Sequence, residues 1–419
     1  NLARQIRPVQ VEDVLGRETV DVDLNTAGAY VRDRAVLVTG AGGSIGSELC
    51  RQIQSLSPKK LLLLDHSEYA LYSIHEELSS VNVRQGYNFE IIALLASVAP
   101  NFLLRRVLSE HRVDTIYHAA AYKHVPLVEF NPCEAIRNNV VGTLRVAEAA
   151  VAEKVENVVL ISTDKAVNPT NVMGVTKRIA EYLVLHLNRG QGTRFTVVRF
   201  GNVMGSNGSV VPLFTEQIRK GGPVTVTHPD MVRYFMTIRE ACDLVVSAAS
   251  HALGPDRSDV SVYVLNMGQP VKIAELAERM IRLSGLEPGV DVQIEFIGLR
   301  RGEKLSEELN GADEDLVPSR VPKVQVVRQR SVIGPSDEDV REVCSRVSPD
   351  GEVGVAAVNA AYRPEEGAGG WTHEAHLVRG ARTNPDQVRA LTRSGSVLVG
   401  LSEDVVCCAH VVAEDGVAH

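Results

Sequence analysis

Apolar runs of strand length alternate with segments of helical period along much of the 419-residue chain. The run AVLVTG at 35–40 is followed by KLLLLD at 60–65, and between them apolar residues recur at helical spacing (Ile45, Leu49, Ile53 and Leu56). The alternation continues through the strand-like runs at 89–95, 113–121, 155–163 and 195–205. Because the apolar residues in these runs are consecutive, each strand is expected to be covered on both faces. The pattern therefore predicts an α/β fold built on a doubly wound parallel sheet.

The same pattern divides the chain into three parts. Residues 1–33 are polar and are expected to form a lead-in or linker, whereas residues 34–335 form one large domain. Within it we expect a nucleotide-binding core at 34–200 and a smaller, mixed α/β substrate-binding lobe mainly at 201–335. In that lobe, helices alternate with the strand-like runs at 223–228, 262–268 and 292–298. Periodicity then fades, so residues 336–419 are predicted to be a weakly patterned tail.

Charge and cysteine content narrow the possible partners and location. The net charge of −8 gives the chain no overall attraction to nucleic acid or anionic lipid. The six cysteines lack the CxxC spacing of zinc sites and are too scattered for a disulfide framework, which favours the cytoplasm. No run approaches the roughly 18 to 20 apolar residues that cross a bilayer, and no signal peptide is recognisable. Because the sequence starts at Asn1, we expect any tether to the inner membrane to lie in a segment absent from this chain.

A glycine-rich stretch, TGAGGSIGSE, follows the first strand-like run and opens the first helical segment. In this setting the first glycine makes a tight turn, the second lets the backbone approach a pyrophosphate, and the third lets helix and strand pack closely. Asp65 ends the next strand-like run, where a carboxylate binds ribose hydroxyls and repels a 2′-phosphate, so NAD is favoured over NADP. A Rossmann-type dinucleotide site is therefore predicted. A phosphate-loop NTPase is disfavoured because no Lys-Ser/Thr pair follows the glycines.

Longer motifs, spread over about residues 5 to 330, point to one group of enzymes. They are VLVTGAGGSIGSEL, HAAAYKHVPLVE, NNVVGT, STDKAVNPTNVMGVTKR, RFGNVMGSNGSV, RYFMTIREA and GLRRGEKLSEEL. On these motifs the chain resembles the extended short-chain dehydrogenase/reductase superfamily. Within it, the chain looks like the nucleotide-sugar 4,6-dehydratases of bacterial polysaccharide biosynthesis, in particular the UDP-N-acetylglucosamine 4,6-dehydratases. The resemblance implies NAD as cofactor and a UDP-sugar as substrate, and we also expect a homo-oligomer.

The resemblance implies that the STDK segment carries the catalytic residues. Ordinary members of the superfamily use a Tyr-x-x-x-Lys pair together with a hydroxyl group at the end of the preceding strand. Here Thr163 matches the hydroxyl and Lys177 matches the lysine. Met173 replaces the tyrosine, as it does in one branch of the dehydratases. A thioether carries no proton to exchange, so Met173 would shape the pocket. By resemblance, Asp164 is the acid of the elimination and Lys165 is the base, which must be neutral to act. Both reach one substrate only if the strand ends and the backbone turns at Asp164.

The resemblance also implies two sets of binding residues. Those expected to contact the cofactor are Gly40, Gly43, Ser44, Ile45, Gly46, Asp65, Ser67, Ser97, Val98, Ala119, Ala120 and Lys177. Those expected to contact the substrate are Lys123, Asn202, Arg233, Arg300 and Glu303. In the second set, guanidinium groups suit phosphates and a carboxylate suits ribose hydroxyls.

Several other positions complete the sequence picture. Asn139 is expected to bridge neighbouring backbone segments, whereas His118 and His124 lack metal-ligand spacing, so no metal site is expected. The chain departs from the usual family pattern at Arg301, where proline is typical, and at 94–100, where an aspartate commonly contacts adenine.

Two other functions compete with dehydration. A UDP-sugar 4-epimerase would need a hydroxyl base at position 173 and no acid–base pair at 164 and 165. A catalytically inactive NAD or UDP-sugar binding module would not need Asp164, Lys165 and Lys177 together. We therefore expect dehydration of UDP-N-acetylglucosamine. Thr163 is well placed but a poor base, so the group that takes the proton of the carbon-4 hydroxyl is left open between a water relay and an ionised Asp164.

Overall fold

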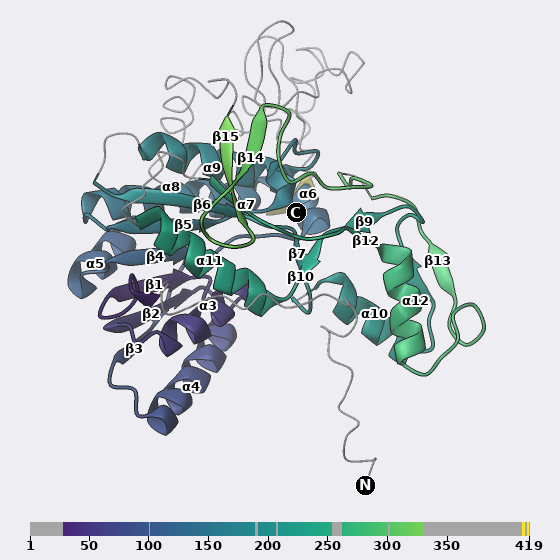
Figure 1. Cartoon of the computed structure of the whole chain (residues 1–419), viewed down its shortest axis with the longest axis horizontal. Helices are drawn as coiled ribbons and strands as arrows, with labels where there is room; N and C mark the ends of the chain where they lie inside the picture. The colour runs from purple at the N-terminus through teal and green to yellow at the C-terminus, as the bar shows by residue number, and fades with distance from the viewer. Residues whose placement is uncertain are drawn as a thin grey trace, which may run out of the picture.

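The structure is a computed structural model that describes residues 28–99, 101–188, 192–206, 208–253, 262–300 and 302–329, and the backbone of two short strands, β16 (Ala413–Glu414) and β17 (Val417–Ala418). Most of the expected lead-in at 1–33 and nearly all of the expected tail at 336–419 lie outside these residues. The described domain is organised around one large sheet (Figure 1). Among the described residues, every helix is too short or too polar to cross a bilayer.

The central sheet has the order β14-β15-β11-β6-β5-β4-β1-β2-β3. Its strands are β1 (Ala35–Thr39), β2 (Lys60–Asp65), β3 (Glu90–Leu95), β4 (Thr115–His118), β5 (Asn157–Ile161), β6 (Arg194–Arg199), β11 (Val262–Leu265), β14 (Glu314–Pro318) and β15 (Val324–Gln329). From β11 to β3 all neighbours are parallel, so the predicted Rossmann-type α/β class is confirmed. Strand order reverses at β1, between β2 and β4, and ligands bind at the carboxyl ends of the strands at such a point.

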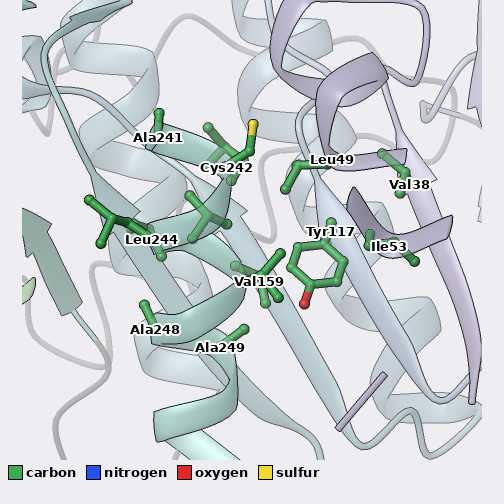
Figure 2. Close-up of a cluster of buried hydrophobic side chains, with 14 of the residues drawn as sticks. Val38, Leu49, Ile53, Tyr117, Val159, Ala241, Cys242, Leu244, Ala248 and Ala249 are labelled. Atoms are coloured by element: carbon green, nitrogen blue, oxygen red, sulfur yellow. The ribbon is translucent and has the colours of Figure 1, made fainter. Parts of the chain in front are cut away.

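Helices cover both faces of this sheet. They are α3 (Ser44–Ser55), α4 (Glu68–Gln85), α5 (Asn101–His111), α8 (Gly142–Ala152), α9 (Val172–Leu187) and α11 (Ile238–Leu253). Val36 and Val38 of β1 enter the core shared with α3, α4 and α11, whereas Leu37 enters the core shared with α5, α8 and α9. Figure 2 shows the first core, where side chains of α3 and α11 converge over Tyr117 and Val159. Two cores explain why the strands are apolar at successive positions.

A smaller lobe lies to the right in Figure 1 and has its own core. It is built from α10 (Val210–Arg219), β8 (Val224–Val226), β9 (Val232–Arg233), β12 (Val271–Lys272), α12 (Ile273–Leu283) and β13 (Ile294–Phe296). Strand β13 pairs in parallel with β8, and β12 pairs antiparallel with β9. Two short parallel strands, β7 (Asn202–Val203) and β10 (Phe235–Met236), lie between this lobe and the large domain.

The structure differs from the predicted division of strands in two places. The run at 262–268, expected in the smaller lobe, forms β11 beside β6 in the central sheet, because Tyr263 and Val264 enter the cores on opposite faces. The run at 195–205 is interrupted: β6 ends at Arg199, and β7 begins at Asn202 with a different partner. Sequence periodicity indicates that a segment is buried, but it does not specify the strand with which that segment pairs. Both differences concern the pairing partner.

A buried charge cluster ties α9 to the antiparallel edge of the sheet. Arg199, at the end of β6, donates to Glu181 of α9 at 2.8 Å and to Glu314 of β14 at 2.7 Å. Burial alone would raise the pKa of Glu181, but the charge and hydrogen bonds of Arg199 lower it below its usual value. Glu181 also accepts a bond from Ser162 at 2.6 Å, so the cluster holds α9 against the segment that follows β5.

Candidate active site

The predicted cofactor residues gather around the carboxyl ends of β1, β2 and β4. Gly40, Gly43, Ser44, Ile45, Gly46 and Ala119 line one cavity, and Asp65, Ser67, Ser97, Val98, Ala119 and Ala120 line the adjoining one. A third cavity, of about 280 Å³, is lined by Thr163, Lys165, Met173, Lys177, Lys123 and Asn202. Ile45, Ala119, Tyr122 and His124 are shared between the first and the third, so the three cavities form one continuous crevice.

The glycine loop leaves the first turn of α3 open. A Cβ atom at Gly46 would lie 1.9 Å from the carbonyl oxygen of Gly40, so no other residue fits there without moving the loop. The N-cap residue of α3 is Gly43, and no side chain caps it. The first turn of this helix lines the first cavity and places the positive end of the helix dipole there, which suits a pyrophosphate.

Asp65 closes β2 beside this loop. Its carboxylate accepts from the backbone amides of Gly42 and Ser67, each at 2.9 Å, and the residue is 6% exposed. These bonds fix the carboxylate at the rim of the second cavity. The position agrees with the predicted contact to the adenosine ribose, which stays a prediction.

The STDK segment forms the turn on which the expected acid and base depend. Strand β5 ends at Ile161, and a 3₁₀ turn, η3 (Asp164–Ala166), follows with Thr163 as its N-cap. Thr163 Oγ1 donates to Asp164 Oδ1 at 2.9 Å, and Lys165 Nζ donates to the same oxygen at 3.0 Å. Because the backbone turns at Asp164, consecutive side chains meet at one point, as the sequence required.

Both charged groups of this turn are enclosed. The Asp164 side chain is fully buried, and within the described residues its Oδ2 has no hydrogen-bond partner. That oxygen lies against Gly201, where an added Cβ would be 3.0 Å away. Lys165 Nζ makes a second bond, to Asn202 Oδ1 at 3.0 Å. Lys165 therefore lines the third cavity, whereas Asp164 is buried beside it with one carboxylate oxygen that lacks a partner among the described residues.

Helix α9 brings Met173 and Lys177 to the wall of the third cavity. Asn171 caps it by accepting from the Gly174 amide at 2.8 Å. Met173 is 3% exposed and packs against Val128 and Ala135, so the position of the usual tyrosine holds no titratable group. Lys177 Nζ donates to the carbonyl oxygen of Ile161 at 2.6 Å, and burial lowers its pKa to about 8.

Two polar residues fix the loop after β4. Asn139, on the π-helical turn η2 (Ile136–Val141), accepts from the amide of Tyr122 and donates to its carbonyl oxygen and to Thr176, so it forms the expected bridge. His118 bonds Thr39 at 2.7 Å and Thr143 at 3.0 Å, and burial, with the nearby charge of Lys177, lowers its pKa to about 3. His118 is thus a neutral structural residue beneath the crevice.

The predicted substrate residues fall into two groups. Lys123 and Asn202 line the third cavity, and burial lowers the pKa of Lys123. Arg233 is buried, and its guanidinium donates to the carbonyl oxygens of Val232, Lys304 and Leu305. Arg300 is exposed and Glu303 is half-buried, and the Arg300 amide donates to the Glu303 carboxylate at 3.2 Å. Arg233, Arg300 and Glu303 do not line the third cavity, so their contacts with substrate stay predictions.

One acidic residue near the catalytic turn was missed by sequence reasoning. Glu307 is buried, and its Oε1 lies 3.8 Å from both Lys165 Nζ and Arg233. The signal was present, because Glu307 belongs to the motif GLRRGEKLSEEL, but nothing in the motif separates it from its exposed neighbour Glu308.

Comparisons with known proteins place these features in a family. A family model described as "Polysaccharide biosynthesis protein" matches residues 36–329. The capsular polysaccharide biosynthesis protein CapD of Staphylococcus aureus is 52% identical over 310 residues, 74% of this chain and 50% of CapD. The probable polysaccharide biosynthesis protein EpsC of Bacillus subtilis is 49% identical over 324 residues, 77% of this chain and 53% of EpsC. The chain thus spans about half the length of these curated relatives.

The chain is also similar to an epimerase and to two solved structures. A UDP-glucose 4-epimerase of Rickettsia massiliae is 34% identical over 292 residues, covering 67% of this chain and 79% of the epimerase. Among solved structures, Pen from Bacillus thuringiensis is 34% identical with a TM-score of 0.64, covering 72% of this chain and 89% of Pen. MoeE5 in complex with UDP-glucuronic acid and NAD is 26% identical with a TM-score of 0.51, covering 65% and 88%.

Proposed function

This chain belongs to the polysaccharide biosynthesis protein family, and from that premise we propose that it is an NAD-dependent dehydratase of UDP-N-acetylglucosamine. The product is a UDP-4-keto-6-deoxy sugar for glycan biosynthesis. The reaction oxidises carbon 4, eliminates water across carbons 5 and 6, and returns a hydride to carbon 6. The observation that carries the proposal is the Asp164–Lys165 pair, joined at 3.0 Å on one turn through an oxygen, Asp164 Oδ1, that also accepts a hydrogen bond from Thr163.

The crevice fits NAD. The first turn of α3 would hold its pyrophosphate, Asp65 would hold its adenosine ribose, and Lys177, which lines the third cavity, would hold its nicotinamide ribose. When bound, the nicotinamide accepts and returns the hydride. The MoeE5 complex with NAD and a UDP-sugar has the same fold, which supports this choice of cofactor and substrate class.

The hydrogen bond between Thr163 and Asp164 supplies a path for the first proton. Thr163 accepts the proton of the carbon-4 hydroxyl while passing its own to Asp164 Oδ1, 2.9 Å away. Thr163 alone is a poor base, and the adjacent carboxylate removes this difficulty. Asp164 thereby becomes a carboxylic acid at the moment when the next step needs one.

The pair then carries out the elimination. Lys165, which is neutral at the start of the cycle, removes the proton from carbon 5, which the neighbouring ketone has acidified. Asp164 gives its new proton to the carbon-6 hydroxyl, which leaves as water. When hydride returns to carbon 6, Lys165 protonates carbon 5, and both side chains regain their starting charge. Every proton is accounted for with Thr163, Asp164 and Lys165 alone.

The competing 4-epimerase activity has one observation in its favour, the Rickettsia relative at 34% identity. An epimerase needs a base at the position of Met173, which here is a thioether packed against Val128 and Ala135. It also has no use for an acid and a base aimed at carbons 5 and 6. An inactive binding module would not require the bonded arrangement of Thr163, Asp164 and Lys165.

Product identification tests the proposal. The purified protein is incubated with UDP-N-acetylglucosamine, and the products are examined by NMR and mass spectrometry. We expect a 4-keto-6-deoxy sugar nucleotide with no net formation of NADH. Recovery of the 4-epimer would establish the epimerase instead, and unchanged substrate from folded, NAD-loaded protein would leave a binding module.

A further inference from the structure

Glu307 lies 3.8 Å from the amine of Lys165 but does not line the third cavity. We propose that Glu307 is a positioning residue that holds Lys165 for proton transfer at carbon 5; this inference rests on the proposed dehydratase function. Its side chain is 4% exposed and that of Lys165 is 18% exposed, so the carboxylate acts on the amine through protein and not through solvent.

The smaller lobe delivers Glu307 to this place through a segment, residues 302–308, that docks on the catalytic loop. The carbonyl oxygen of Gly302 accepts from Thr170 at 3.1 Å and from Asn171 at 3.0 Å. Lys304 donates to the carbonyl oxygen of Val167 at 3.2 Å. These bonds join the segment to the loop that runs from η3 to the N-cap of α9. The position of Glu307 relative to Lys165 is therefore fixed by bonds on the same loop.

Arg233 secures the segment from the other side. Its guanidinium donates to the carbonyl oxygens of Lys304 at 2.8 Å and Leu305 at 3.1 Å, and lies 3.8 Å from Glu307 Oε1. Arg233, predicted from sequence to contact substrate phosphate, is thus engaged in holding this segment.

The amine of Lys165 has two hydrogen-bond acceptors and one further carboxylate neighbour. Asp164 Oδ1 and Asn202 Oδ1 both lie 3.0 Å from Nζ, and Glu307 Oε1 lies at 3.8 Å. The two oxygens within hydrogen-bond distance orient the amine, and the Glu307 carboxylate lies just outside that distance. When Asp164 takes up a proton and loses its charge, Glu307 is the carboxylate that still holds the amine. This keeps Nζ in place during the step in which it acts.

The burial of Glu307 favours a role beyond stability. Within the described residues its Oε2 is buried and has no hydrogen-bond partner. An incompletely bonded buried carboxylate costs free energy, and replacing a buried ion pair with apolar side chains is often stabilising. A carboxylate retained under this cost beside a catalytic lysine is best explained by what its charge does there.

The test is Glu307→Gln, which keeps the size of the side chain and removes its charge. Two readouts separate the steps: NADH absorbance in a single turnover reports oxidation at carbon 4, and deuterium uptake from heavy water reports proton exchange at carbon 5. We expect kcat and the carbon-5 exchange to fall by about tenfold to a hundredfold, the penalty typical of a misplaced catalytic group. The KM for the sugar nucleotide and the oxidation at carbon 4 should change less than about twofold.

Two further variants serve as controls. Glu307→Asp retains the charge and should restore part of the carbon-5 exchange. Glu295→Gln makes the same charge change at an exposed position of β13 and should match the wild-type protein in both readouts.

Three outcomes overturn the inference. They are an unchanged carbon-5 exchange in Glu307→Gln, an equal loss of both steps together with a lowered melting temperature, and an increase confined to KM. If the wild-type protein forms no 4-keto-6-deoxy product, the proposed function fails and this inference fails with it. Wild-type turnover with an unaffected Glu307→Gln variant overturns the role of Glu307 alone.

Discussion

The hydroxyl of Thr163 donates to the carboxylate of Asp164, with 2.9 Å between Oγ1 and Oδ1. If this bond carries the carbon-4 proton, Thr163→Val should lower the rate of carbon-4 oxidation by about a hundredfold or more, as for loss of an acid–base group. Thr163→Ser keeps the hydroxyl and should stay within a few-fold of wild type. Single-turnover NADH absorbance distinguishes them, and a Thr163→Val variant as fast as Thr163→Ser would remove Thr163 from the path.

Lys165 provides the second prediction. Lys165→Ala should abolish deuterium exchange at carbon 5 and lower product formation by at least about a hundredfold, because no other amine is bonded to Asp164 within the described site. NAD binding, measured by calorimetry, should be retained. Lys59→Ala removes an exposed lysine near the opposite ends of the strands and serves as the control. Undiminished exchange in Lys165→Ala would show that another group is the base.

A substitution at Met173 tests whether this side chain only fills space or takes part in the reaction. Met173→Leu conserves volume in the contact with Val128 and Ala135, so it should cost less than about 1.5 kcal/mol in unfolding free energy and leave kcat within a few-fold. A thioether and an isobutyl group both lack an exchangeable proton. Loss of turnover in a Met173→Leu protein of normal stability would mean that the sulfur itself takes part.

The neutral, buried His118 makes stability depend on pH in a defined window. Its pKa is about 3 in the folded protein, below the ordinary value of 6.5 that it regains on unfolding. Between these values the unfolded state binds more protons, so the unfolding free energy should fall as pH is lowered from about 6.5. Urea unfolding at pH 7 and pH 5 measures this loss. His118→Gln should lose less stability over that interval, and an identical loss would assign the effect to other groups.

Much of this site could be predicted from sequence because it depends on local order. The glycine loop, the end of β5 and the turn at Asp164 are set by neighbours in the chain, and Thr163, Asp164 and Lys165 meet because a 3₁₀ turn follows the strand. The predicted cofactor residues gathered for the same reason, since they follow parallel strands whose carboxyl ends share one edge of the sheet.

The remaining features depend on contacts between distant segments. Glu307 reaches Lys165 only because Gly302 and Lys304 dock on the catalytic loop. Arg233 was predicted to contact phosphate from its residue type, yet its partners are backbone carbonyl groups, which no residue pattern records. The placement of β11 in the central sheet likewise depends on its pairing with β6, which periodicity does not specify.

The central claim is that one catalytic cycle moves a hydride from carbon 4 to carbon 6 while water is lost. The most direct measurement uses UDP-N-acetylglucosamine labelled with deuterium at carbon 4 and locates the label in the product by NMR. The dehydratase account predicts deuterium at carbon 6 of a 4-keto-6-deoxy sugar and cofactor recovered as NAD⁺. Deuterium retained at carbon 4, in a 4-epimer or in unchanged substrate, would contradict it.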